Sequence, residues 1–356
     1  MTFHLPTSIS ESLVDCKDAR LTSFETELLD DATTLVALDL AFRHGLIGKL
    51  EITARDPGSA DATRLELGFV TTVLSGAGAL QKTASGACKL TPIMCDLLSE
   101  RGQSLAARAY FGVLALRDLV NFGDALVSNE PEFRARAQTF SFFRYDRAQS
   151  TKAANVQDTE PWVQYVTALS ELEALSLVPM IPLDGCTNLL EIGGNSGAFA
   201  MGLVREWPEL SVSILDLPAV CYLGEKYLSD KDHRARISFV PGDAETTQWP
   251  ECDAILFKSM LHDWRAERAV LFLQRAAQHL PAGGRLIVCE RGPIEHERDL
   301  KGAIAATNLV FAPFYRNPEF YKTEMRKLGL IIEAQGDEPG TSKMDMEFHV
   351  ICGLKP

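Results

Sequence analysis

Residues 189–197 read Leu189-Leu190-Glu191-Ile192-Gly193-Gly194-Asn195-Ser196-Gly197, and they give the clearest indication of the fold. Its first four residues have the character of a short buried strand. The glycines that follow predict a tight turn, and a helix is expected from about Ser196 to Glu206. Strand, glycine turn and helix in this order predict an α/β fold whose backbone approaches a ligand closely at the turn.

The same alternation of strand-like and helical segments continues on the C-terminal side of this stretch. Short β-rich runs separated by helical segments predict strands at 189–192, 212–217, 237–240, 254–257 and 286–289. This alternation is typical of a parallel sheet with helical crossovers. Two further runs, 330–334 and 348–352, are predicted to form a final antiparallel pair.

The N-terminal side is mostly helical. Apolar spacing predicts helix from about Leu21 to Ile52, interrupted at Gly45, and again over 65–80. Residues 81–91, with Gly86, read as a polar hairpin, and Pro92 opens another helix. This order outlines a winged helix. Because 65–80 contain neither Arg nor Lys, and Arg64 only precedes them, we expect this surface to be buried against a partner chain rather than to bind DNA.

From residue 97 to about residue 182 the pattern remains helical, and we expect linking helices there. An aromatic cluster in this region is predicted either to pack in a core or to form a wall of a substrate pocket. Its members are Phe140, Phe142, Phe143, Tyr145, Trp162 and Tyr165.

Charge and composition exclude several classes of function. The formal net charge is −13 with no long basic run, so nucleic acids and anionic membranes would be repelled. No eighteen uninterrupted apolar residues occur and residues 1–11 do not resemble a signal peptide, so we expect a cytoplasmic protein. The eight cysteines and seven histidines form no metal-ligand spacing, so no metal is expected.

Asp216 ends the second predicted strand, twenty-five residues after Glu191. A carboxylate at this position can accept hydrogen bonds from a ribose diol, so the turn and Asp216 predict a nucleoside site. Gly193, Gly194 and Gly197 give GGxxG rather than the GxGxxG of dinucleotide folds. Glu191 would repel phosphates but suits the cationic sulfonium and ammonium of S-adenosylmethionine (SAM). A capping or structural role for Glu191 is the alternative.

A second motif, Phe257-Lys258-Ser259-Met260-Leu261-His262-Asp263-Trp264, follows the fourth predicted strand. Ligands of open α/β sheets bind beyond the carboxyl ends of the strands, where the imidazole of His262 can take a proton from an attacking hydroxyl. Glu290 ends the next strand, so we expect it beside His262, orienting the ring. The alternative for Glu290 is a carboxylate that caps the following loop.

Five segments together resemble the class I SAM-dependent O-methyltransferases related to caffeate, hydroxyindole and phenazine or polyketide methyltransferases. The segments are Glu191-x-Gly193-Gly194-x-x-Gly197, Leu215-Asp216-Leu217-Pro218, Gly242-Asp243, Leu261-His262-Asp263-Trp264 and Gly283-Gly284-Arg285-Leu286. The resemblance covers almost the whole chain. It implies a Rossmann-like SAM-binding mixed sheet, preceded by a mostly helical winged-helix-like domain that forms a homodimer.

The resemblance also implies roles for single residues. His262 matches the family's general base, and Glu290 matches one of the two carboxylates that flank it. Asp216 is implied to hold the ribose, Asp243 to lie near the adenine amine and Lys258 to line the cofactor site. The full set of expected cofactor-binding residues is Glu191, Gly193, Gly194, Gly197, Asp216, Leu217, Asp243, Ala244, Lys258 and Trp264.

Two departures from the family pattern affect the site. The turn reads Gly194-Asn195-Ser196-Gly197 where the family usually has GGGTG, and the family's second catalytic Glu aligns with Phe320. Glu319, one residue away, is the candidate replacement. Arg144, Arg147 or Arg316 could anchor an acidic substrate, although exposed arginines are usually only solvated.

These observations predict a homodimeric SAM-dependent methyltransferase that acts on a small, hydroxyl-bearing secondary metabolite. The expected segments are a dimerisation domain at 1–100, linking helices and part of the pocket at 101–183, and the SAM-binding domain at 184–356. One alternative is methylation of carbon or nitrogen on a 2-oxo acid or an amino-acid-like substrate. Another is a regulator or scaffold that binds SAM without transferring a methyl group.

Overall fold

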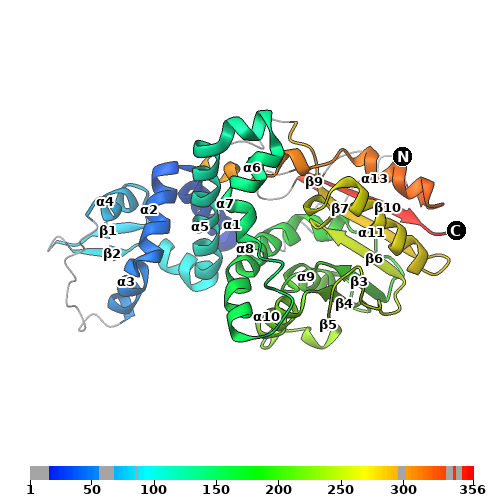
Figure 1. Cartoon of the computed structure of the whole chain (residues 1–356). Helices are drawn as coiled ribbons and strands as arrows, with labels where there is room; N and C mark the ends of the chain where they lie inside the picture. Colours follow the sequence, from blue (N-terminus) through cyan, green and yellow to red (C-terminus); the bar gives the residue numbers. More distant parts are fainter. Residues whose placement is uncertain (1–15, 56–67, 85–86, 296–301, 334–339, 342–346) are drawn as a thin grey trace, which may run out of the picture. The chain divides into compact units, whose positions relative to one another are not determined.

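The computed structural model describes residues 16–55, 68–84, 87–295, 302–333, 340–341 and 347–356. The chain divides into two compact units, one made of 1–120 with 301–307 and the other of 121–300 with 308–356 (Figure 1). Every helix in the described ranges is too short or too polar to cross a membrane. The three segments expected from the sequence, with bounds at 100 and 183, stay a prediction.

The first unit opens with three helices, α1 (Cys16–Asp30), α2 (Ala32–Arg43) and α3 (Leu46–Arg55). Asp31 caps α2, because its Oδ1 accepts the N–H of Thr34 at 2.7 Å. Gly45 separates α2 from α3 with a φ of +68°, a conformation that favours glycine. The break at Gly45 confirms the prediction. The sequence does not predict the second break, at Asp31 between α1 and α2, because the helical spacing of apolar residues continues across this position.

A small hairpin follows these helices. After α4 (Gly68–Gly76), strands β1 (Leu80–Lys82) and β2 (Cys88–Leu90) pair antiparallel, with β1 along α4 and β2 along α3 (Figure 1). The long α5 (Pro92–Ser128) begins at the predicted proline and is interrupted at Arg101, which has non-helical dihedrals. The hairpin and this helix start are confirmed. Residues 65–67 and Gly86 lie outside the described residues, and the winged-helix assignment stays a prediction.

Leucines fill the core of the first unit, and one carboxylate is buried beside it. Leu28, Leu35 and Leu38 are fully buried there. The carboxylate of Glu25, 1% exposed, accepts hydrogen bonds from Arg108 at 2.6 Å and from Arg101 at 3.2 Å. These bonds tie α1 to both parts of α5 and leave the buried charge compensated.

The second unit alternates helices with the strands of one sheet. Its α-helices are α6 (Glu130–Arg136), α7 (Gln138–Phe142), α8 (Ala153–Leu177), α9 (Ala198–Glu206), α10 (Pro218–Leu228), α11 (Ala266–His279) and α13 (Pro318–Lys327), while α12 (Ala306–Leu309) spans the boundary between the units. Short 3₁₀ helices are η2 (Val178–Met180), η3 (Arg234–Arg236), η4 (Leu261–Asp263) and η7 (Ala312–Phe314), and η6 (Ala303–Ala305) belongs to the first unit.

Within the described residues, the sheet has eight strands in the order β5-β4-β3-β6-β7-β10-β8, with β9 paired to β10. Five neighbouring strands are parallel: β5 (Ile237–Pro241), β4 (Ser211–Asp216), β3 (Asn188–Ile192), β6 (Ala254–Lys258) and β7 (Arg285–Arg291). The antiparallel strands are β10 (Glu347–Leu354), β8 (Ile331–Ile332) and β9 (Gly340–Thr341). The predicted α/β mixed sheet is confirmed.

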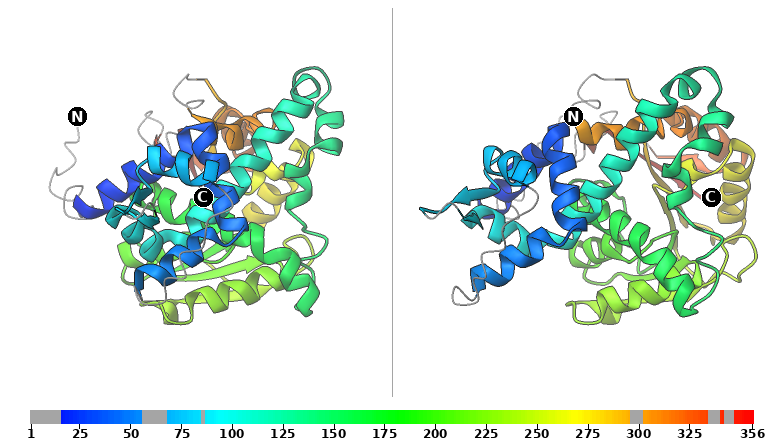
Figure 2. Two further views of the ribbon diagram at one scale, coloured as in Figure 1. Left: turned by 90° about the vertical axis from the view of Figure 1, so that its left-hand side faces the viewer. Right: turned by 60° about the vertical axis from the view of Figure 1, so that its left-hand side comes forward.

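Helices cover both faces of this sheet (Figure 2), so its strands are apolar on both sides. Leu189 and Ile214 pack against α9 on one face, while Leu190 and Ile255 pack against α11 on the other. Two-sided burial explains why these strands are nearly continuous apolar runs. In such a run a charged residue stands out, and Glu191 is one, at 1% exposure.

The last strand differs from its prediction in two respects. The two predicted strands do pair antiparallel, but through Gly353 and Leu354, just beyond the predicted 348–352, opposite Ile332 and Ile331; residue 334 lies outside the described residues. However, β10 also pairs with β7 over seven positions, from Phe348 opposite Arg291 to Leu354 opposite Arg285. Alternating apolar character identifies a strand but not its partner, so this pairing escapes the sequence.

Candidate active site

The candidate site lies at the carboxyl ends of β3, β4, β6 and β7. The chain runs outward from β3 through β4 to β5, then returns to the other side of β3 at β6. Loops on the two sides of this switch point diverge and leave a crevice, which is where open α/β sheets bind ligands. The predicted motifs at Glu191, Asp216, His262 and Glu290 all stand at this edge.

The turn after β3 requires its glycines. Gly193 and Gly197 have φ values of +74° and +81°, and Asn195 between them has +53°. A methyl group on Gly193 would come within 2.8 Å of Met260 Cγ, and one on Gly194 within 2.8 Å of Ile214 Cγ2. The small residues predicted here are therefore demanded by backbone conformation and by close neighbours within the protein.

Glu191 is a buried carboxylate at this turn. Its Oε2 has no hydrogen-bond partner among the described residues. Burial, and to a smaller degree the charge of Asp216, raises the pKa of Glu191 to about 8, although Lys258 opposes the shift. A buried, unpartnered acid is costly unless a donor or a cation reaches it, so Glu191 is a candidate for contacting a ligand.

Asp216 ties the turns after β3 and β4 together. Its Oδ2 accepts the N–H of Asn195 at 2.9 Å, and its Oδ1 accepts the N–H of Leu217 at 2.7 Å. Burial raises the pKa of Asp216 to about 6 despite these two bonds. Each carboxylate oxygen keeps a second lone pair for a further donor.

Lys258 belongs to a buried ionic cluster at the ends of β6 and β7. Its Nζ donates to Ser170 Oγ at 3.3 Å and to Glu173 Oε2 on α8, and Arg291 donates to Glu173 Oε1 at 2.5 Å. Burial alone would raise the pKa of Glu173, but Arg291 and Lys258 outweigh it and the pKa is lowered. Glu173 and Arg291 escape the sequence analysis, although a Glu within the apolar run of α8 is a usable signal.

The structure brings His262 and Glu290 together as predicted. His262 lies in η4, and its Nδ1 is 2.6 Å from Glu290 Oε2. Glu290 Oε1 accepts the N–H groups of Met260 at 2.8 Å and Leu261 at 2.6 Å. Burial would raise the pKa of Glu290, but His262 and these N–H groups prevail and hold it below its ordinary value. Glu290 is therefore ionised at neutral pH.

Asp263 and Trp264 continue this loop. Asp263 Oδ1 lies 3.6 Å from His262 Nε2, and Asp263 Oδ2 accepts the hydroxyl of Tyr145 at 2.8 Å. Burial raises the pKa of Asp263, opposed by the charge of His262. The ring of Trp264 is covered by the guanidinium of Arg268, whose Cζ is 3.7 Å from the ring centroid.

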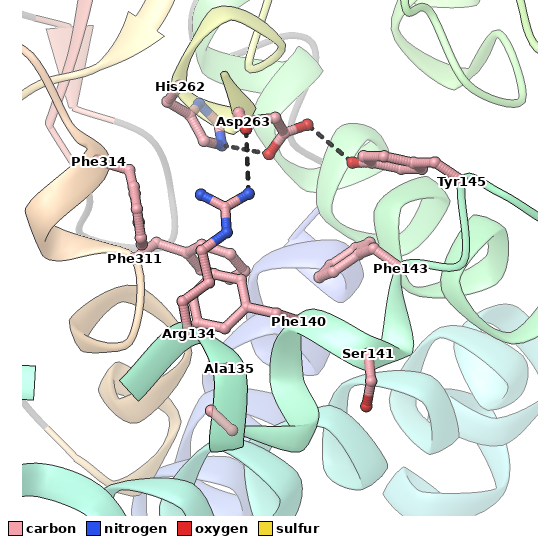
Figure 3. Close-up of a pocket in the computed structure, with 11 residues that line it drawn as sticks. Arg134, Ala135, Phe140, Ser141, Phe143, Tyr145, His262, Asp263, Phe311 and Phe314 are labelled. Carbon is pink, nitrogen blue, oxygen red and sulfur yellow. Dashed lines mark hydrogen bonds and ion pairs between the residues drawn. The ribbon is translucent and has the colours of Figure 1, made fainter. Parts of the chain in front are cut away.

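A pocket of about 320 Å³ opens beside His262 (Figure 3). This volume is within the range of small-molecule sites, roughly 300–1,000 Å³. The described residues that line it are Arg134, Ala135, Ala137, Phe140, Ser141, Phe143, Tyr145, His262, Asp263, Phe311 and Phe314. Three members of the predicted aromatic cluster thus form a pocket wall. Trp162 instead packs in a core with Val220 and Leu223, which bears out the other interpretation.

The remaining predicted cofactor residues lie after β5 and β4. Asp243 is half-buried and its Oδ1 accepts the N–H of Glu245 at 2.8 Å. The carbonyl of Ala244 accepts the indole N–H of Trp249 at 3.1 Å. Leu217 packs beside the Trp162 core. These loops follow neighbouring parallel strands and so border the same edge of the sheet as Asp216.

The structure does not bring Glu319 into this group. Its side chain is 61% exposed on α13, and its carboxylate contacts Lys322 at 2.9 Å and Arg326 at 3.7 Å. The catalytic role of Glu319 stays a prediction, without support from these surroundings.

The three arginines named from the sequence have other partners. Arg144 pairs with Asp146 and Arg147 with Asp158, both on the surface. Arg316 donates to the carbonyls of Leu261, at 2.8 Å, and of Trp264. It therefore braces the loop that carries His262. The arginine among the described lining residues is Arg134, which no motif in the sequence marks.

Comparison with known proteins places this geometry in a family. A model of the O-methyltransferase domain matches residues 121–323, more than half of the chain. The L-tyrosine C(3)-methyltransferase of Streptomyces lavendulae is 29% identical over 170 residues, which cover 48% of this chain and 45% of that protein. The 3-hydroxy-5-methyl-1-naphthoate 3-O-methyltransferase of Streptomyces sahachiroi is 28% identical over 156 residues, covering 42% and 44%.

Each match therefore spans less than half the length of these two curated relatives. The fold extends further than the sequence match. The crystal structure of human N-acetylserotonin methyltransferase in complex with SAM superposes with a TM-score of 0.62, covering 97% of this chain and 99% of that one at 17% identity.

Proposed function

This chain belongs to the O-methyltransferase family, and on that premise we propose that it transfers a methyl group from SAM to a hydroxyl oxygen of a small aromatic metabolite. The observation that carries the proposal is the His262–Glu290 pair, which is buried at the end of β6 and β7 and opens onto an aromatic pocket. A base, its orienting carboxylate and a pocket for a flat acceptor are the parts that this reaction needs.

The residues after β3 and β4 fit SAM. The unpartnered Oε2 of Glu191 offers a buried negative charge for a cationic ligand, and Asp216 keeps lone pairs for a ribose diol. We assign contacts with the cofactor to both of these residues and to eight others at the same ends of the strands. The eight are Gly193, Gly194, Gly197, Leu217, Asp243, Ala244, Lys258 and Trp264. When bound, SAM supplies a methyl group that its positively charged sulfur makes electrophilic.

His262 acts as the base in this scheme. Because ionised Glu290 can only accept, the hydrogen of the neutral ring belongs on Nδ1, and Nε2 carries the lone pair. Nε2 takes the proton from the acceptor hydroxyl. Glu290 at 2.6 Å and Asp263 at 3.6 Å then stabilise the imidazolium that forms.

Two measurements test the cofactor and base assignments. We expect calorimetry to detect SAM binding by the wild type, and Asp216→Ala to weaken it strongly. His262→Ala should still bind SAM but lose about 10²- to 10⁴-fold in kcat, the usual contribution of a positioned base. The exposed His44 provides the control, since His44→Ala should change neither quantity. A wild-type protein that does not bind SAM would contradict the proposal, and binding without any turnover would favour a SAM-binding scaffold.

Carbon methylation is the second candidate, favoured by the match to a tyrosine C(3)-methyltransferase. Removing the proton of a phenol also raises electron density on the ring carbon next to the oxygen, so the same base serves both acceptor atoms. The position of the new methyl group, read from the mass and NMR spectra of the product of a phenol screen, distinguishes the two.

We further propose that the protein acts in the cytoplasm as a homodimer joined through its first unit. Large apolar side chains lie exposed there, including Phe69 at 61% and Val120 at 84%. The buried thiols Cys186, Cys221, Cys289 and Cys352 fit a reducing compartment. Phe69→Asp should shift the mass found by sedimentation equilibrium toward the monomer. Leu271→Asp, at a 60% exposed position of the second unit, is the matched control.

A further inference from the structure

Arg134 lines the aromatic pocket, with its guanidinium close to two of the pocket's rings. It lies on α6, which Phe133 anchors with a fully buried ring. The Arg134 Cζ is 5.3 Å from the ring centroid of Phe140 and 5.0 Å from that of Phe314. Both rings line the pocket, so the planar guanidinium is held at its wall by stacking and cation–π attraction.

The hydrogen-bonding capacity of Arg134 is mostly unused. Its single hydrogen bond within the described part of the chain runs from Nη2 to the carbonyl of Asp263, at 3.5 Å. No carboxylate in that part of the chain forms an ion pair with it. By contrast, Arg136 on the same helix pairs with Glu132 at 2.9 Å, and Arg144 pairs with Asp146 at 2.9 Å. A guanidinium has five N–H donors, and Arg134 is an exposed residue, so most of its donors face solvent and can exchange water for a ligand.

Arg134 faces the same space as the proposed base. Figure 3 shows its side chain reaching from α6 toward Asp263 and His262, with Phe311 and Phe314 beside it. Among the eleven lining residues, all within the described ranges, Arg134 is the only Lys or Arg. The carboxylate in the pocket, Asp263, accepts the Tyr145 hydroxyl and also lies within the field of Arg134, although the two form no ion pair in the described part of the chain. An acceptor whose hydroxyl meets His262 would therefore place a second substituent near an available cation.

We propose that Arg134 binds a carboxylate carried by the aromatic acceptor, so that the preferred substrates are hydroxylated aromatic acids rather than neutral phenols. This inference rests on the proposed methyl transfer and names its substrate class. The guanidinium fork matches a carboxylate in a bidentate arrangement, while the surrounding rings accept the flat body of the ligand. A neutral acceptor would leave the donors of Arg134 without this partner.

The first test compares matched pairs of acceptors, each a hydroxynaphthoic or hydroxybenzoic acid and its methyl ester. The wild type should favour the acids in kcat/KM, and Arg134→Gln should reduce the acid-to-ester ratio by about 10- to 100-fold, the usual effect of losing a charged hydrogen bond. The loss should fall mainly on KM. Arg134→Lys should recover part of the ratio. Arg136→Gln, two residues along the same helix, should leave it unchanged.

A ratio that is the same in the wild type and in Arg134→Gln would overturn the inference while leaving methyl transfer intact. A second measurement separates it from failure of the proposed function. Calorimetric titration of the same acids into the protein saturated with S-adenosylhomocysteine requires no turnover. Binding that weakens at least about tenfold in Arg134→Gln supports the inference. Unchanged binding in this variant, or no binding of any acid by the wild type, overturns it.

Discussion

The side chain of Met260 lies directly against Gly193, so the loop after β6 packs against the turn after β3. A methyl group at Gly193 would be 2.8 Å from Met260 Cγ and 3.4 Å from its Cβ. Met260 also donates its N–H to Glu290. Through this one residue, the proposed cofactor turn, the loop that carries His262 and the carboxylate that contacts His262 Nδ1 are held in a common arrangement.

We therefore expect Gly193→Ala to destabilise the protein and to weaken SAM binding. A non-glycine residue at a φ of +74° costs about 1–3 kcal/mol, and the contact with Met260 adds to that cost. Gly185 has a φ of +76°, and a methyl group added there would meet no atom within 4 Å, so Gly185→Ala is a control that isolates the backbone cost. Urea denaturation should show the larger loss in Gly193→Ala. Equal losses would mean that Met260 moves aside freely.

Glu290→Gln should abolish most activity without loss of SAM binding. The Gln oxygen replaces Oε1 as acceptor for the Met260 and Leu261 N–H groups, which turns the amide NH₂ toward His262 Nδ1. The ring must then accept at Nδ1 and carry its hydrogen on Nε2, so it cannot take a proton from the acceptor. Single-turnover kinetics should show a fall in rate of about 10²-fold or more. Glu206→Gln, at an exposed position, serves as control, and a fall of less than twofold in Glu290→Gln would contradict the orienting role.

The pKa of Glu191 predicts how stability changes with pH. It is about 8 in the folded protein, against an ordinary value of 4.5. Between these values the folded protein holds a proton that the unfolded chain has released, so the free energy of unfolding falls as the pH rises. The slope is at most about 1.4 kcal/mol per pH unit. Unfolding measured from pH 6.5 to 8, above the pKa of Asp216 at about 6, should show a flatter slope in Glu191→Gln. Equal slopes in the wild type and in Glu191→Gln would show that Glu191 does not cause the pH dependence.

The same carboxyl should release its proton when SAM binds. A cation beside Glu191 favours the ionised form, so binding near pH 7 converts the acid to a carboxylate. Calorimetric titrations in buffers of different ionisation enthalpy should report the release of up to about one proton per SAM bound. Glu191→Gln should eliminate most of it. Release that persists in this variant would assign the proton to another group.

Glu173→Gln should destabilise the second unit strongly. The substitution removes the charge that compensates Lys258 and Arg291, both buried, and breaking a buried pair costs about 3–5 kcal/mol. The exposed Glu132–Arg136 pair provides the comparison, since Glu132→Gln should cost no more than about 1 kcal/mol. Thermal unfolding of the two variants side by side checks this, and similar losses would show that the cluster is hydrated in solution.

The sequence predicts the pairing of His262 with Glu290 because parallel strands align their carboxyl ends. His262 follows β6 and Glu290 lies near the end of β7, and these strands are neighbours, with Lys258 opposite Cys289. Once an α/β sheet is recognised, the placement of these side chains at one edge follows from topology alone. The glycine turn is equally readable, since positive φ restricts the residue type.

The opposite wall of the pocket could not be predicted in the same way. Arg134 and Phe314 meet through the packing of α6 and η7, elements about 180 residues apart that carry no periodic signal linking them. Local sequence around Arg134 resembles any exposed helix face. Glu319 is the converse case, because its position in the alignment suggests catalysis while the first turn of α13 leaves its carboxylate in solvent beside Lys322.

The antiparallel strand β10 is inserted into the sheet between strands that are synthesised before it. Among the strands in the described ranges, β10 is synthesised last, yet it lies between β7 and β8, with His349 opposite Glu290. Until it arrives, the backbone edge of β7 that bears Glu290 has no partner strand and is open to pairing with other nascent chains. Pairing of β10 therefore completes the strand edge that bears Glu290 and removes an exposed edge of β7 in the same step.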